Sequence, residues 1–100
     1  MDFGDALHHL KDGSRVTRVG WNGSSMWLVL VPGSTITVSA GRPLGDAVPE
    51  LVGESVEYRS HIDLKTVDDQ IVPWVASQTD LLADDWAAVV TDSLAGNKEE

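Results

Sequence analysis

The sequence predicts a small α+β domain, in which an antiparallel β-sheet is accompanied by an N-terminal helix and a short C-terminal helix. Apolar residues repeat at helical spacing near the N-terminus, several strand-like segments follow, and a helix-capping pattern precedes a last strand-like segment. This order of elements is typical of α+β proteins with an antiparallel sheet. The 100 residues suffice for one domain, which we place at residues 1–92, before a flexible acidic tail at 93–100.

The N-terminal helix is predicted over residues 3–12, between an Asp2 N-cap and a Gly13 stop signal. Its apolar residues recur at helical spacing: Phe3, Ala6, Leu7 and Leu10. A strand follows at 15–21, and GWNGSS then has the composition of a turn. The next strand, MWLVLV at 26–31, is nearly all apolar, which indicates burial on both faces.

The second half alternates strands with turn signals. STITVS at 34–39 reads as a strand, whereas residues 40–55 contain three glycines and two prolines and are predicted to form an irregular loop. Strands at 55–67 and 70–75 flank a hairpin turn at Asp68 and Asp69. Ser77 and Asp80 form a capping box that opens a short helix through Trp86, and residues 87–92 form the final strand.

Charge and composition exclude several classes of protein. Sixteen acidic residues against seven Lys and Arg give a net charge of -9, which opposes binding to polymeric nucleic acid. The chain has no cysteine, so disulfides and thiolate metal sites are excluded. No apolar run approaches the roughly 20 residues that span a bilayer, and the N-terminus does not resemble a secretory signal. These features predict a cytoplasmic protein that does not enter membranes.

Catalytic and metal-binding patterns are sparse. His61 and Asp63 share one face of a strand and are either an acid–base dyad or an exposed polar pair. A catalytic nucleophile or a phosphate-binding loop does not accompany them, so the polar pair is favoured. Asp80, Asp84 and Asp85 could recruit a cation or could simply complement a helix dipole. We therefore predict no catalytic site, no metal and no cofactor.

The four tryptophans are the feature that needs an explanation. Trp21 lies in a predicted turn and Trp74 follows Pro73, whereas a routine core residue is expected in mid-strand. Rings at such positions can stack nucleobases, and the neighbouring amides of Asn22 and Gln78 can read base edges. Trp27 and Trp86 are more typical of core or subunit contacts. The alternative is that all four rings fill the core of a small sheet.

Five basic residues could supply cations to the same ligand: Arg15, Arg18, Arg59, His61 and Lys65. They lie in strand-like segments, which can bring them to one pocket even though the protein as a whole is acidic. The alternative is that most of them are solvated charges on strand faces. Of this set, we include Arg59 among the predicted ligand-binding residues.

Several segments resemble, in order and spacing, the phage and prophage family that includes the second Thoeris anti-defence protein. These segments are FGDALHHLKDG, GWNG, MWLVLVPGS, YRSHIDLK and IVPWVASQTDLLADDW, and together they span roughly residues 3–90. The resemblance implies a protein without enzymatic activity that forms a homotetramer from two dimers. It also implies a sponge that binds glycocyclic ADP-ribose made by TIR-domain defence enzymes, and in some members cyclic oligonucleotides, and holds the signal intact in the infected host.

The resemblance also implies a set of ligand-binding residues. GWNG contributes Trp21 and Asn22, and PWVASQTD contributes Trp74, Ser77, Gln78 and Asp80. The chain departs from the family pattern at Ser24 and Ser25, where a Lys-Gly pair is expected, so one phosphate-binding cation is missing there. Two other functions remain open: an acidic interaction module that inhibits a host protein directly, and a hydrolase that uses His61 and Asp63.

Overall fold

The computed structural model describes residues 1–21 and 25–89, and the chain divides into two compact units. Unit 1 consists of residues 1–30 and 62–100, and unit 2 consists of residues 31–61. Every strand pair with a described register is antiparallel, and helices accompany the strands, so the predicted α+β class is confirmed. The predicted tail at 93–100 lies outside the described residues.

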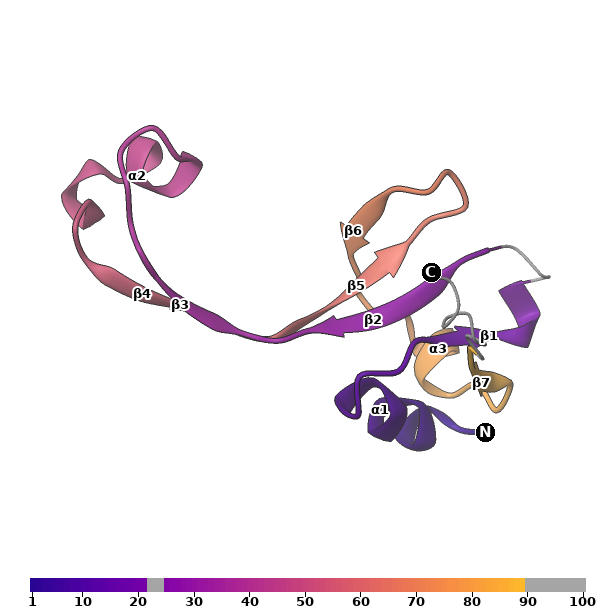
Figure 1. Ribbon diagram of the computed structural model, residues 1–100. Coiled ribbons are helices and arrows are strands. Elements are labelled where there is room, and N and C mark those ends of the chain that lie inside the picture. Colours follow the sequence, from indigo (N-terminus) through magenta and orange to yellow (C-terminus); the bar gives the residue numbers. More distant parts are fainter. Residues whose placement is uncertain (22–24, 90–100) are drawn as a thin grey trace, which may run out of the picture. The chain divides into compact units, whose positions relative to one another are not determined.

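A five-stranded sheet with the order β6-β5-β2-β1-β7 forms the centre of unit 1 (Figure 1). Strands β2 and β5 each extend by one residue into unit 2. The elements of unit 1 are α1 (Phe3–Lys11), β1 (Val16–Arg18), a 3-10 helix η1 (Val19–Trp21), β2 (Trp27–Val31), β5 (His61–Lys65), β6 (Ile71–Pro73), α3 (Gln78–Leu81) and β7 (Trp86–Ala88).

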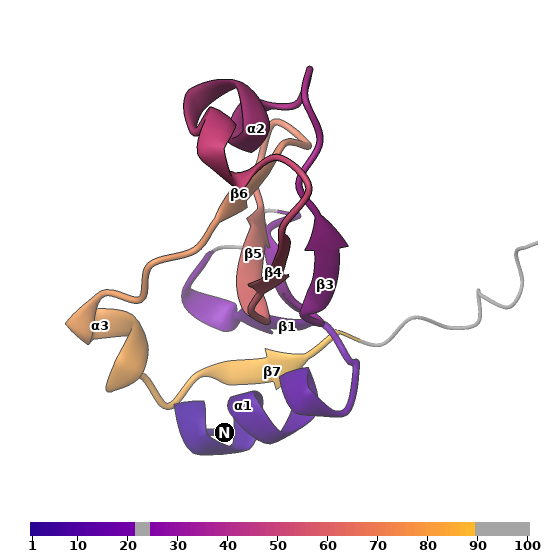
Figure 2. The same ribbon diagram turned by 90° about the vertical axis from the view of Figure 1, so that its left-hand side faces the viewer.

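The N-terminal helix forms as predicted. The Asp2 carboxylate accepts a hydrogen bond from the Asp5 N–H at 2.9 Å, which caps the helix, and Gly13 has the positive φ of 92° that suits the residue after a helix end. Ala6 and Leu10 are fully buried because α1 packs against β1 and β7 (Figure 2). They join Val16, Leu28 and Trp86 in the core of unit 1.

Two predicted boundaries were wrong in unit 1. The strand predicted at 15–21 ends at Arg18 because the next two N–H groups bond to Asp85: that of Val19 to its carbonyl and that of Gly20 to its carboxylate. Residues 19–21 therefore form η1. The helix after Ser77 ends at Leu81, and Trp86 instead begins β7, which pairs with β1.

Burial of β2 on both faces was also wrong. Only Leu28 is fully buried, and the other residues of this strand are half-buried. The apolar run therefore leaves accessible surface, which the sequence alone does not reveal because a buried face and a partly covered face select the same residues.

The hairpin at Asp68 and Asp69 is confirmed by the antiparallel pairing of β5 with β6. Asp69 takes the positive φ of 64° that such a turn requires. Its carboxylate lies 2.7 Å from the Lys65 ammonium, and the Thr66 N–H bonds to the Gln70 carbonyl at 2.7 Å. These contacts hold a turn that lacks the usual glycine.

Unit 2 is a two-stranded ribbon of β3 (Ser34–Thr37) and β4 (Ser55–Tyr58), closed by α2 (Pro43–Ala47) and a 3-10 helix η2 (Pro49–Leu51). The prediction of an irregular loop at 40–55 was wrong, since both short helices begin at a proline, a residue that is favourable at the first helical position. The strand predicted at 55–67 is divided into β4 and β5. Within residues 1–21 and 25–89, no helix is long and apolar enough to cross a membrane.

Candidate ligand-binding site

Three aromatic rings gather around Trp86 in unit 1. The Trp86 side chain is 2% exposed, and its ring centroid lies 5.3 Å from that of Phe3, 5.6 Å from that of Trp21 and 6.1 Å from that of Trp74. Trp21 and Trp74 meet Trp86 nearly edge-on, at 78° and 85°, and both remain half-buried. The two tryptophans predicted to bind ligand thus both contact the same buried ring, that of Trp86.

Trp74 is held by the end of the β5–β6 ladder. Pro73 lies opposite Asp63 on β5, and the Trp74 N–H then donates to the Ile62 carbonyl at 3.0 Å. Strand β6 is at an edge of the sheet, where a proline does not interrupt a second ladder. The Trp74 backbone therefore has a defined position, and its ring contacts both Trp86 and Phe3.

Trp21 is held by a carboxylate from a distant part of the chain. It is the last residue of η1, whose Gly20 N–H donates to Asp85 Oδ2 at 2.6 Å. A Cβ atom on Gly20 would lie 2.7 Å from the same carboxylate oxygen, so a larger residue there would displace the carboxylate. Asn22, the next predicted ligand-binding residue, lies outside the described residues.

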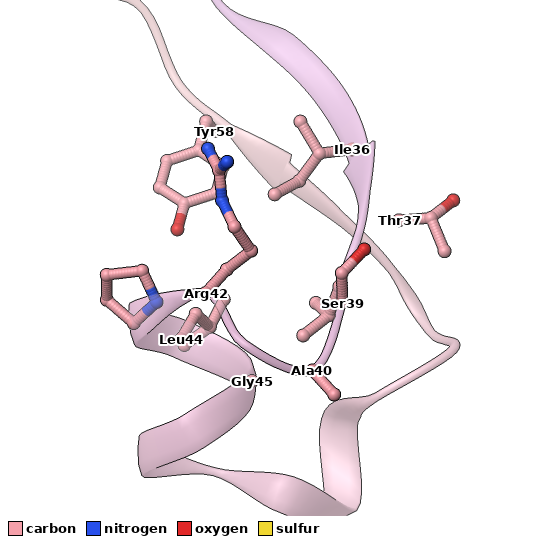
Figure 3. Close-up of a pocket in the computed structure, with 10 residues that line it drawn as sticks. Ile36, Thr37, Ser39, Ala40, Arg42, Leu44, Gly45 and Tyr58 are labelled. Carbon is pink, nitrogen blue, oxygen red and sulfur yellow. The ribbon is translucent and has the colours of Figure 1, made fainter.

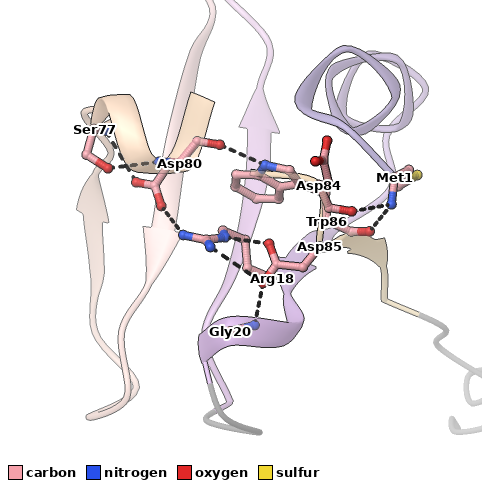
Figure 4. A network of polar contacts seen from close by, with 8 residues as sticks. All are labelled: Met1, Arg18, Gly20, Ser77, Asp80, Asp84, Asp85 and Trp86. Atoms are coloured by element: carbon pink, nitrogen blue, oxygen red, sulfur yellow. Dashed lines mark hydrogen bonds and ion pairs between the residues drawn. The ribbon is translucent and has the colours of Figure 1, made fainter. Parts of the chain in front are cut away.

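The Arg18 guanidinium lies between two carboxylates in this region (Figure 4). Arg18 Nε donates to Asp85 Oδ1 at 2.8 Å, and Nη1 donates to Asp80 Oδ1 at 3.0 Å. The hydrogen bond from Arg18, followed in effect by that from Gly20, holds the pKa of Asp85 below its usual value against the opposing effect of desolvation. Hydrogen bonds to Asp85 and then Asp80 raise the pKa of Arg18. Arg18 and Asp85 therefore stay charged at neutral pH.

The predicted capping box at Ser77 and Asp80 is present. Ser77 Oγ accepts from the Asp80 N–H at 3.0 Å, and Asp80 Oδ2 accepts from the Ser77 N–H at 3.3 Å. The Asp80 carbonyl also accepts from the Trp86 indole N–H at 2.9 Å. Asp80 therefore joins the helix cap, Arg18 and the central ring, while Gln78 is the exposed first residue of α3.

Two of the three acidic residues for which a cation or a helix-dipole role was considered pair with an arginine of the same chain. Asp80 and Asp85 both pair with Arg18, and the described part of the chain contains no group of three side chains suited to hold a metal ion. Sequence analysis considered these carboxylates and Arg18 separately and missed that they meet. The signal available in the sequence was the presence of acids beside Trp86 together with an arginine beside Trp21.

The other basic residues do not share one pocket in unit 1. The Arg15 guanidinium lies 5.1 Å above the centre of the Trp27 ring, a cation–π contact. Lys65 Nζ donates to both the carbonyl and the hydroxyl of Ser25 at 2.9 Å. Strand β5 thus brings a cation to Ser25, where the family pattern has glycine, while Ser24, at the expected lysine position, lies outside the described residues.

The remaining predicted residues, Arg59, His61 and Asp63, lie close in sequence to residue 61, at which unit 2 ends. Arg59 is an exposed residue of unit 2 and is not part of the aromatic cluster in unit 1. His61 and Asp63 lie two positions apart on β5, and His61 Nδ1 is 3.2 Å from the Arg59 carbonyl oxygen.

A pocket of about 570 Å³ lies in unit 2 and contains none of the predicted ligand-binding residues (Figure 3). Ile36, Leu44 and Tyr58 contribute apolar surface, and the Arg42 side chain extends along the same opening. The sequence did not reveal it, because it forms where α2 folds against the end of β3. Gly45 permits this close approach: a Cβ atom there would overlap the Ser39 carbonyl.

Comparison with known proteins covers nearly all of the described chain. Residues 1–89 match a family described as the Thoeris anti-defense 2-like domain. A protein of Bacillus phage SP01 named Thoeris anti-defense 2 is 42% identical over 89 residues, which make up 89% of this chain and 94% of that protein. The aromatic cluster, the α3 cap and the Arg18 trio all lie within the matched region, and the chain belongs to the Thoeris anti-defense 2-like family.

Proposed function

We propose that this protein is an anti-defence sponge that binds a nucleotide immune signal and holds it intact. The observation that carries the proposal is the pair of half-buried rings, Trp21 and Trp74, fixed beside the buried Trp86. The name of the phage relative supports a role against the Thoeris defence. The ligand that we propose is glycocyclic ADP-ribose, made by a TIR-domain enzyme in the cytoplasm of the infected host. Cyclic oligonucleotides are proposed as further ligands.

Stacking is the interaction that this arrangement offers. An aromatic ring stacks on a base for about 1 to 3 kcal/mol, and a ring already fixed by its neighbours loses little freedom when the ligand binds. Trp86 and Phe3 fix Trp74 from inside the protein, and Asp85 fixes the backbone next to Trp21. The accessible parts of both rings then provide a prepared surface for a purine.

The phosphate groups of a nucleotide need a cationic side chain whose charge is not already neutralised by carboxylates. Arg18 is shared by two carboxylates, and the trio of +1 and twice -1 sums to -1, so it would not attract phosphate. Lys65 is better suited although its side chain is also only 13% exposed, because it pairs with one carboxylate instead of two and contacts Ser25, four residues beyond Trp21. Its partner Asp69 is 80% exposed and can turn into solvent without an unpaired charge being buried.

Sequestration predicts self-association as well. A chain of 10.8 kDa has little surface with which to enclose a ligand, and unit 1 retains accessible apolar residues such as Leu82 and Val75. A homotetramer built from two dimers would enclose more of the ligand between chains, and light scattering would then give about four times the mass of one chain.

The test is to recover the ligand after binding. Purified protein is incubated with a filtrate from cells with an activated TIR-domain defence enzyme, washed, and heat-denatured, and the released material is analysed by mass spectrometry and assayed for signal activity. We expect unmodified, active cyclic nucleotide. Release of only linear or hydrolysed product would indicate an enzyme instead. Loss of defence with no nucleotide bound would favour direct inhibition of a host protein.

A further inference from the structure

We propose that Arg18 and Asp85 are positioning residues, which fix Trp21 and the α3 segment against Trp86 and thereby set the geometry of the ligand-binding surface. This inference rests on the proposed function, since it names two residues that control that surface without touching ligand. Neither residue belongs to the set that the sequence analysis assigned to ligand binding.

Asp85 controls the turn that carries Trp21. Its carbonyl accepts from the Val19 N–H at 3.0 Å, and its Oδ2 accepts from the Gly20 N–H at 2.6 Å. Both contacts act on the two residues immediately before Trp21. Asp85 also immediately precedes Trp86, the first residue of β7. One residue therefore links the turn that carries Trp21 to the strand that carries Trp86. The edge-on contact of Trp21 with Trp86 follows from this arrangement.

Arg18 extends the same link to the segment after Trp74. Its guanidinium donates to Asp85 on one side and to Asp80 on the other. Asp80 caps α3 through Ser77, and its carbonyl accepts from the Trp86 indole. The Arg18 guanidinium therefore connects the two chain segments that carry Trp21 and Trp74, and Figure 4 shows it between Asp80 and Asp85.

Burial and charge favour a positioning role over direct ligand contact. The side chains of Arg18 and Asp80 are 16% and 15% exposed, so their polar atoms are largely withdrawn from solvent. Transferring the guanidinium to a phosphate would leave both carboxylates without their cation, and this is costly above all at Asp80, because Asp85 is 32% exposed. The planar fork of arginine suits this double pairing, whereas a lysine ammonium would not reproduce it.

The first test compares Asp85→Asn with Asp84→Asn, a matched loss of charge at the adjacent residue. Asp84 accepts a hydrogen bond from the Met1 ammonium through its backbone carbonyl, which the substitution retains. Near-ultraviolet circular dichroism of the ligand-free protein reports the coupling of the tryptophan rings. We expect Asp85→Asn to reduce this signal with the far-ultraviolet spectrum retained. Its affinity for purified glycocyclic ADP-ribose should fall about tenfold or more, the scale of a lost hydrogen bond to a charged group. Asp84→Asn should leave both measurements close to the parent.

A second variant covers the case in which Asp85→Asn does not fold. Gly20→Ala retains all three charged residues, but its Cβ atom displaces the Asp85 carboxylate, so the same loss of tryptophan signal and affinity is expected. Unchanged spectra and affinity in a folded Asp85→Asn or Gly20→Ala protein would overturn the inference. If the parent does not bind the probe, the proposed function fails, and the ligand-free spectra alone still decide whether Arg18 and Asp85 position the rings.

Discussion

The two units of this protein hold their shape by different means. Unit 1 buries Ala6, Leu10, Val16, Leu28 and Trp86 in a common core. In unit 2, Val38 alone is a buried hydrophobic residue among the described residues, with 3% of its surface exposed. All four residues of β3 are exposed. Side-chain burial therefore accounts for unit 1 and does not account for unit 2.

Backbone contacts take the place of a core in unit 2. Strands β3 and β4 pair over four residues from Ser34 to Thr37, and Val38 exchanges hydrogen bonds of 2.9 Å with Glu54 and Gly53. Gly45 is buried against the Ser39 carbonyl. Because unit 2 depends on close approach of backbone segments, we expect an added methyl group to reduce its stability. Unit 1 should instead lose stability when a buried ring is removed.

The largest effect is expected for Trp86→Ala in unit 1. The substitution removes the central ring and the hydrogen bond to Asp80, and large core truncations cost about 3 to 5 kcal/mol of unfolding free energy. Thermal and denaturant melts measure this loss. Trp27→Ala is the matched control, because Trp27 is half-buried and lies outside the ring cluster, so it should cost clearly less. Equal losses would show that Trp86 has no special place in the core.

A smaller effect, on binding, is expected for Trp74→Ala. Loss of one stacked ring should weaken nucleotide binding by about 1 to 3 kcal/mol in calorimetric titration, with the oligomer retained. Trp74→Phe keeps an aromatic face and should recover part of the affinity. A folded Trp74→Ala protein that binds like the parent would show that Trp74 is only a packing residue, and the site should then be sought around Trp21.

Unit 2 sharpens the comparison through a pair of small substitutions. In an ordinary helix Gly→Ala gains roughly 0.5 to 1 kcal/mol, but at Gly45 the new Cβ atom overlaps backbone, and overpacking costs about 1 to 3 kcal/mol. We therefore expect Gly45→Ala to destabilise the protein. Ile36→Ala, which removes a side chain that is 38% exposed, should cost less than about 1 kcal/mol. The reverse order in chemical melts would mean that another surface covers the β3–β4 ribbon.

Local signals predicted much of unit 1. The Asp2 cap, the Ser77–Asp80 capping box and the hairpin at Asp69 each depend on a few neighbouring residues, and all three are present. The wrong strand end at Arg18 depends instead on Asp85, which is 67 residues away in the sequence, and Trp86 belongs to a strand because it pairs with Arg18 on β1. A strand pattern cannot show that the N–H groups at its end have a distant acceptor.

The candidate site was also predicted only in part. Unusual positions of Trp21 and Trp74 identified two rings that the structure brings to Trp86, but the residues that fix them were not identified. Arg18 was grouped with four other basic residues as either a pocket cation or a solvated strand-face charge, and Asp85 with two other acids as either a cation ligand or a complement to a helix dipole. Their pairing with each other satisfies both charges, and complementary charges far apart in a sequence have too many combinations to be matched by inspection.

The charged trio has a consequence for acid conditions. The pKa of Asp85 is lower in the fold than its usual value, so its stabilising effect is fully present above the unfolded-state pKa of about 4 and is lost only as the pH falls through the lower folded-state value. The raised pKa of Arg18 keeps the guanidinium charged throughout this interval. Mild acidification thus leaves the Arg18–Asp85 pair intact, and the support that this pair gives to the turn before Trp21 does not weaken until the solution is strongly acidic.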